Sequence, residues 1–81
     1  MSTEEQVHAL IISHLNWTGS PDELTPEYPL IEQHVIDSLG MLKLVALLEE
    51  QFGIDVDDVD LVPTNFSTIA EIASFVDSKR A

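Results

Sequence analysis

The chain has 81 residues, and 15 Asp and Glu against three Lys and Arg give it a formal net charge of −12. Such a chain offers no basic face for phosphate groups, which excludes a nucleic acid as the default partner. The 44% of hydrophobic residues excludes a disordered chain, but the length supports only one small core. We therefore expect a single domain over residues 1–81.

The sequence contains no cysteine, so neither a disulfide nor a thiolate metal site can stabilise the fold. It has no basic segment followed by an apolar run at its start, and its uninterrupted apolar stretches are short. These features predict neither a signal peptide nor a membrane span. We expect a cytoplasmic monomer whose core is stabilised by packing alone.

The first predicted helix covers about residues 3–16. Ser2 and Glu5 have the spacing of a capping box, in which each side chain pairs with a backbone amide at the helix start. Apolar residues then recur at helical spacing, at Val7, Leu10, Ile11 and Leu15. Turn-forming residues at 19–21 end this pattern.

Residues 18–36 hold three of the four prolines and are predicted to form a loop. Within it, Ser20, Pro21 and Glu23 follow the order of a cap, a first-turn proline and a third-position acid, which favours one helical turn. A loop of this length needs apolar anchors to stay compact. The candidate anchors are Leu24, Tyr28, Leu30 and Ile31.

A second helix is predicted between Asp37, a suitable N-cap, and Gly53, a suitable residue just beyond the last turn. One side of this helix is apolar over an arc wide enough to face a core. The residues on that side are Met41, Leu44, Val45, Leu48 and Phe52.

A second apolar stripe remains on the opposite side of the same helix. It consists of Leu39, Leu42 and Ala46, flanked by Lys43, Glu49 and Glu50. The stripe is either a docking surface for a partner protein or a surface that the loop of residues 18–36 covers. Helical periodicity gives these two interpretations equal weight.

The acidic segment from Asp55 to Asp60 is predicted to be a helical turn or a loop, because it is short and highly charged. Its spacing does not fit a calcium-binding loop that begins at Asp55. Such a loop needs glycine at the position of Asp60 and a bidentate acid at the position of Phe66. The segment is therefore interpreted as a solvated acidic surface.

A last helix is predicted after Pro63, where Thr68 and Glu71 form a further capping box, and it continues to about Ser78. Together the elements predict an all-α protein, a small helical bundle of three main helices plus a short helical turn.

No residue in the sequence is predicted to be catalytic. His8 and His14 are six residues apart on one helix, so they cannot share a metal-binding face, and no metal site is expected. Ser38 has Asp37 and His34 nearby, but the segment lacks the glycine-flanked strand-to-helix turn of a serine nucleophile. So small a chain also lacks an enclosing pocket. We expect a protein that is not an enzyme, in which Ser38 is an ordinary alcohol at a helix start.

The chain resembles the acyl carrier protein family over nearly all of its length. The residues that carry this resemblance are Asp37-Ser38-Leu39 at a loop-to-helix junction and the segment from Leu48 to Ile54 that ends the same helix. A capped first helix, a long loop and a closing helix after the segment Asn65-Phe66-Ser67 complete the match.

The resemblance implies that Ser38 carries a covalent 4′-phosphopantetheine arm and that Asp37 is the flanking residue of the attachment motif. The arm would be installed by a phosphopantetheinyl transferase, loaded by a ligase or adenylation enzyme, and unloaded by an acyltransferase or synthase. The same resemblance makes the leftover stripe the partner-binding face, with Leu39, Leu42, Lys43, Ala46, Glu49 and Glu50.

Two positions depart from fatty-acid carriers. Lys43 stands where those carriers usually have an acid, and His34 stands where related carriers often have glycine. If that position needs a positive φ, histidine tolerates it at some cost. The lead-in Leu30-Ile31-Glu32 and the stretch Pro63–Phe66 resemble stand-alone aminoacyl and peptidyl carriers, including the D-alanyl type.

The expected function is therefore a discrete carrier of an acyl or aminoacyl thioester in natural-product biosynthesis. The alternatives are a fatty-acid or polyketide carrier and, in a different class, a non-catalytic helical adaptor in which Ser38 stays unmodified.

Overall fold

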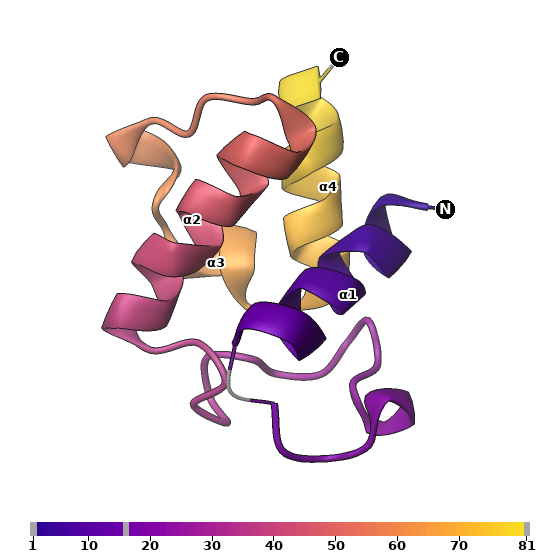
Figure 1. Cartoon of the computed structure of the whole chain (residues 1–81). Coiled ribbons are helices and arrows are strands. Elements are labelled where there is room, and N and C mark those ends of the chain that lie inside the picture. Colours follow the sequence, from indigo (N-terminus) through magenta and orange to yellow (C-terminus); the bar gives the residue numbers. More distant parts are fainter. Residues whose placement is uncertain (1, 16, 81) are drawn as a thin grey trace.

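Three long helices, one short helix and two 3₁₀ turns make up the computed structural model, which describes residues 2–15 and 17–80 (Figure 1). In chain order these elements are α1 (Thr3–His14), η1 (Pro21–Glu23), α2 (Ser38–Phe52), η2 (Asp58–Asp60), α3 (Pro63–Phe66) and α4 (Ile69–Arg80). No strand occurs in the described residues, so the predicted all-α bundle with three main helices is confirmed. The short helix α3 was not predicted.

The predicted starts of α1 and α2 are confirmed by their caps. The Ser2 hydroxyl accepts a hydrogen bond from the Glu5 amide (3.1 Å), and the Ser2 amide donates to the Glu5 carboxylate (3.2 Å). At α2, Asp37 Oδ1 accepts from the Gly40 amide at 2.6 Å. Helix α1 ends at His14, and the predicted last residue, Asn16, lies outside the described residues.

The other helix ends are also set by local chemistry. Gly53 adopts a left-handed conformation (φ 64°) that terminates α2, as the sequence predicts. The Glu71 amide donates to Thr68 Oγ1 at 3.1 Å at the start of α4. This last helix continues to Arg80, two residues beyond its predicted end at Ser78.

Residues 18–36 run beneath the bundle in Figure 1 and are held there by the predicted anchors. Leu24 and Leu30 are buried, whereas Tyr28 and Ile31 are half-buried against the core. Two backbone hydrogen bonds attach the loop to the α3–α4 junction: the Leu30 amide donates to the Ser67 carbonyl (2.8 Å), and the Ala70 amide donates to the Pro26 carbonyl (3.0 Å). The loop is therefore fixed just before α2 begins.

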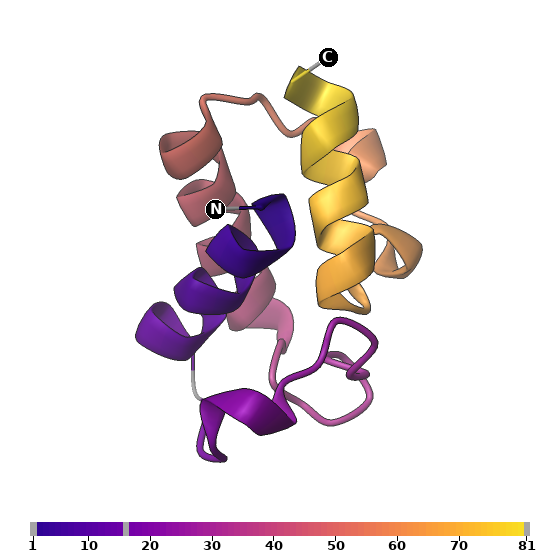
Figure 2. The same ribbon diagram turned by 90° about the vertical axis from the view of Figure 1, so that its right-hand side faces the viewer.

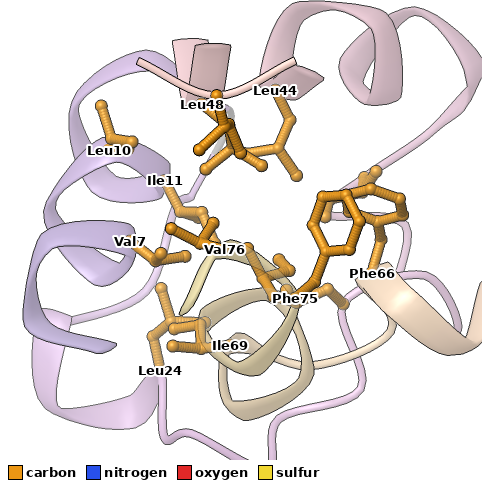
Figure 3. Close-up of a cluster of buried hydrophobic side chains, with 14 residues drawn as sticks. Val7, Leu10, Ile11, Leu24, Leu44, Leu48, Phe66, Ile69, Phe75 and Val76 are labelled. Atoms are coloured by element: carbon orange, nitrogen blue, oxygen red, sulfur yellow. The ribbon is translucent and has the colours of Figure 1, made fainter. Parts of the chain in front are cut away.

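Helices α1, α2 and α4 enclose one apolar core. Figures 1 and 2 show the arrangement of these helices from two directions, and Figure 3 shows buried side chains between them. Its fully buried members include Val7, Ile11, Leu30, Leu44, Leu48, Phe66, Ile69, Ile72 and Val76. No polar or charged residue is buried within residues 2–15 and 17–80. None of the described helices is both long and apolar enough to cross a membrane.

Candidate functional site

Ser38 is the first residue of α2 and is exposed at the junction with the fixed loop. Its hydroxyl makes no hydrogen bond to any residue that the structure describes, whereas the neighbouring Asp37 carboxylate is engaged by the Gly40 amide. A Cβ atom on Gly40 would lie 3.0 Å from Asp37 Oδ1, so glycine leaves room for this cap. The arrangement presents the Ser38 oxygen as a free alcohol that a second enzyme can reach.

The turn that leads into α2 contains a strained residue. His34 has a φ of 61°, in the left-handed region that costs a non-glycine residue about 1 kcal/mol. The amides of Val35 and Ile36 both donate to the Leu30 carbonyl, at 2.9 and 3.2 Å, and this turn directs the chain toward α2. The sequence left open whether this position needs a positive φ; the structure shows that it has one, and His34 accepts the strain.

A surface hollow of about 500 Å³ adjoins Ser38, and we call it the serine hollow. It lies between the loop, the first turn of α2 and the start of α3. Its lining residues are Ile31, His34, Ile36, Asp37, Ser38, Met41 and Pro63. The short helix α3, which was not predicted, thus contributes one wall. A flexible chain attached to the Ser38 oxygen has room to lie along this mostly apolar hollow.

The leftover apolar stripe of α2 is open to solvent. The side chains of Leu39 and Leu42 are 79% and 62% exposed, so the interpretation that the loop covers them is wrong. Lys43, Ala46 and Glu50 are exposed beside them. We call these five residues the outer face of α2.

Glu49, the sixth residue assigned to this stripe, has a structural contact. It is half-buried, and its Oε2 accepts a hydrogen bond from the Val56 amide at 3.0 Å. The carboxylate therefore holds the segment that follows α2, at the edge of the outer face. Periodicity places Glu49 beside the stripe but contains no signal of this contact.

A second group of exposed apolar side chains was missed by the sequence analysis. Val59 is 81% exposed in η2, and Leu61 and Val62 follow it at 38% and 40%. The alternation of acidic and apolar residues between 55 and 61 was the available signal, but alternation alone does not show which side faces water.

Two of the three Lys and Arg side chains are engaged at the C-terminal end of α4. Lys79 Nζ lies 2.7 Å from Asp60 Oδ2 and 3.5 Å from Asp57 Oδ2. The hydrogen bond from Lys79 lowers the pKa of Asp60, and the same bond raises the pKa of Lys79. Arg80 lies over the Phe52 ring at 5.6 Å. Within the described residues, Lys43 has no such ion pair.

The three histidines lie on α1 and in the loop, and they form no metal site with the described acids. His8 Nε2 lies 2.9 Å from the Pro21 carbonyl oxygen, to which it donates, and this bond holds η1 against α1. His14 is exposed at the end of α1, and His34 lies in the loop. In the part of the chain that the structure describes, no three His, Asp or Glu side chains form a metal-binding group.

Comparison with known proteins places this geometry in a family. The family model described as a phosphopantetheine attachment site matches residues 5–76. An acyl carrier protein from Nitratidesulfovibrio vulgaris (strain DP4) is 38% identical over 60 residues, which cover 74% of this chain and 76% of that protein. An acyl carrier protein from Thermotoga maritima is 33% identical over 81 residues, covering 98% of each.

A solved structure gives the same result at the level of the fold. KstB-PCP in its apo form has 34% sequence identity and a TM-score of 0.74, covering 90% of this chain and 80% of that one. The family and the all-α carrier fold expected from the sequence are thus both confirmed. The chain belongs to the acyl carrier protein family, and its prosthetic group is a covalently attached 4′-phosphopantetheine.

Proposed function

We propose that the protein is a discrete, non-catalytic carrier in the cytoplasm that bears its arm on Ser38 and passes an acyl or aminoacyl group between partner enzymes. The observation that supports this proposal most strongly is the Ser38 hydroxyl, which is exposed at the start of α2 beside the serine hollow and makes no hydrogen bond to a described residue. When bound, the arm supplies a terminal thiol that holds the cargo as a thioester.

Attachment requires only an accessible oxygen on this chain. In the site of a phosphopantetheinyl transferase, the Ser38 oxygen attacks the pyrophosphate of coenzyme A and forms a phosphodiester bond. The hydroxyl proton passes to a base of the transferase, and adenosine 3′,5′-bisphosphate leaves. Asp37 keeps the first turn of α2 in place through its hydrogen bond to the Gly40 amide.

The outer face of α2 is the surface on which partner enzymes dock in this proposal. Exposed Leu39 and Leu42 next to Ser38 supply apolar area, and neighbouring large apolar side chains exposed on one helix face are typical of an interaction site. Glu50 and the acidic segment beyond α2 steer the carrier by long-range attraction toward basic patches. A small face of this kind suits brief encounters, because a carrier must leave each partner after transfer.

For the cargo we propose an aminoacyl or peptidyl group in a natural-product pathway. The similarity to KstB-PCP, a peptidyl carrier protein, supports this choice, as do the Leu30-Ile31-Glu32 lead-in and the stretch Pro63–Phe66. The similarity to acyl carrier proteins of Nitratidesulfovibrio and Thermotoga supports the second candidate, a fatty-acid or polyketide cargo.

The test is intact-protein mass spectrometry before and after incubation with coenzyme A and a broad-specificity phosphopantetheinyl transferase. We expect the mass of one phosphopantetheinyl group to be added to the wild type and none to Ser38→Ala, which should retain the same fold by circular dichroism. No mass gain in the folded wild type would overturn the proposal in favour of the helical adaptor.

The holo-protein then allows the cargo to be identified. It is incubated with adenylation enzymes and amino acids, or with acyl ligases and fatty acids, and the mass gain is read in each case. Gain from an amino acid supports the preferred cargo, whereas gain from fatty acids alone supports the second candidate.

A further inference from the structure

A second hollow, of about 240 Å³, lies on the other side of the α2 start. It is lined by His14 from the end of α1, His34 from the loop, and Asp37, Leu39, Gly40 and Lys43 from the beginning of α2, together with Leu15 and Val35. We call it the histidine hollow. Leu39 and Lys43 belong both to this hollow and to the outer face of α2, so the two surfaces are continuous.

The hollow gathers basic groups that have no partner in the described structure. Lys43 makes no ion pair there, whereas Lys79 and Arg80 are engaged at the far end of α4. The rings of His14 and His34 are exposed and make no hydrogen bond to a described residue. The one carboxylate in the lining, Asp37, already accepts from the Gly40 amide.

This clustering is unusual for a chain with a net charge of −12. Two of the three histidines and the free lysine line one hollow of the protein, next to the proposed attachment residue. An ammonium group and ring N–H groups are hydrogen-bond donors, and the ligand that suits them is an anionic oxygen. The backbone of His34 has a positive φ, which glycine would adopt without strain. The chain nevertheless places an imidazole at this position, in the lining of the hollow.

Charges along α2 are therefore separated by sign. Lys43 lies near the Ser38 end, and Glu50 lies seven residues later, about 10 Å along the helix axis. The acidic segment follows beyond Glu50. A partner that carried only basic residues would have to place one of them against Lys43, whereas Glu50 and the acidic segment would attract the others.

We propose that the histidine hollow is a cationic subsite of the docking surface and receives an Asp or Glu side chain of the partner enzyme. This inference rests on the proposed function. The partner carboxylate pairs with the Lys43 ammonium and accepts from the His14 and His34 rings. Charge complementarity at both ends of α2 then fixes the orientation in which the partner meets Ser38.

The sign of the potential at the hollow can be measured on the isolated protein. Two soluble nitroxides, one bearing a carboxylate and one bearing an ammonium group, are added in turn, and amide proton relaxation is recorded by NMR. We expect the cationic nitroxide to dominate over most of the surface and the anionic one to dominate at the amides lining the hollow. Dominance of the cationic nitroxide there as well would overturn the proposal.

The partner side of the proposal is tested with the enzyme that loads the holo-protein in the cargo experiment. We expect Lys43→Gln to lower kcat/KM for loading about 3-fold, the effect of one exposed ion pair, and Lys43→Arg to retain the wild-type value. Ser74→Glu, on the exposed side of α4, changes the net charge by the same amount as Lys43→Gln and should have little effect.

Unchanged or faster loading of Lys43→Gln would overturn the cationic subsite. All variants are first converted to the holo form with excess transferase and checked by mass. A wild type that takes no arm contradicts the proposed function itself, whereas normal arm attachment with loading that is insensitive to Lys43 contradicts only the subsite.

Discussion

Leu48 and Leu42 are the same residue type on the same helix, six positions apart, and they have opposite environments. Leu48 is 0% exposed and packs in the core with α1 and α4, as Figure 3 shows, whereas Leu42 is 62% exposed. A helix that served only the fold would place polar residues at the position of Leu42. The difference indicates that one face of α2 stabilises the protein and the other is available to a partner.

The two ends of α2 also differ in how firmly their side chains are held by neighbouring residues. The last turn is held by neighbours, because Glu49 accepts from the Val56 amide and Arg80 lies over the Phe52 ring. At the first turn, the Ser38 hydroxyl has no partner among the described residues, and His34 nearby is strained. Unsatisfied and strained groups thus gather at the end of the helix that carries the proposed function.

The core face should show the largest effect on stability. Leu48→Ala removes a fully buried side chain and leaves a cavity, which is expected to lower the free energy of unfolding by about 3 kcal/mol. Urea denaturation followed by circular dichroism measures this change. A loss below about 1 kcal/mol would show that Leu48 does not belong to a tightly packed core.

The outer face should show the reverse behaviour. Leu42→Ala is expected to change the free energy of unfolding by less than about 0.5 kcal/mol, because the side chain is already exposed. The kcat/KM of the loading enzyme should fall about 10-fold, as for an apolar contact at the centre of an interface. If instead the variant loads normally, or unfolds as easily as Leu48→Ala, the contrast between the two faces is lost.

Substitutions at His34, in the strained turn before Ser38, should have a smaller effect on the free energy of unfolding. His34→Gly relieves the positive-φ strain but adds backbone freedom to the unfolded chain, so we expect a net stabilisation of about 0.5 kcal/mol. His34→Ala, which keeps the strain, is the matched control and should show no gain. Equal behaviour of the glycine and alanine variants in thermal unfolding would contradict a strained backbone at this position.

The ion pair that holds the acidic segment predicts a dependence on pH. Because Lys79 lowers the pKa of Asp60 below the ordinary 3.8, the unfolded chain binds more protons than the native one near that pH. The wild type should therefore have a larger free energy of unfolding than Asp60→Asn. This difference should reach its full value above pH 3.8 and disappear as the pH falls further. Asp58→Asn, which removes a charge outside this ion pair, is the control, and a pH-independent difference would contradict the linkage.

Local signals in the sequence predict much of the fold. Ser2, Asp37 and Gly53 mark helix ends because caps and left-handed residues depend on neighbours within one turn. The core stripe of α2 is likewise predicted by period alone, as buried Leu44 and Leu48 show. The four-residue helix α3 was missed because a pattern that short has no measurable period.

Features of the candidate site that depend on tertiary contacts could not be predicted. Periodicity finds the outer face of α2, but only the placement of the loop shows that Leu39 and Leu42 are exposed. The bond between Glu49 and the Val56 amide and the gathering of His14 with Lys43 join residues that local patterns treat separately. The attachment motif is the exception, because Asp37, Ser38 and Leu39 are contiguous in the chain.

The central claim, that Ser38 is the attachment residue, is tested most directly by locating the arm in the modified protein. Trypsin cleaves after Lys43, so residues 1–43, with Ser38, separate from residues 44–79, with three other serines. Tandem mass spectrometry of the two fragments should find the phosphopantetheinyl group only on residues 1–43, bound to Ser38. A group on residues 44–79, or on Ser2, Ser13 or Ser20, would contradict the account.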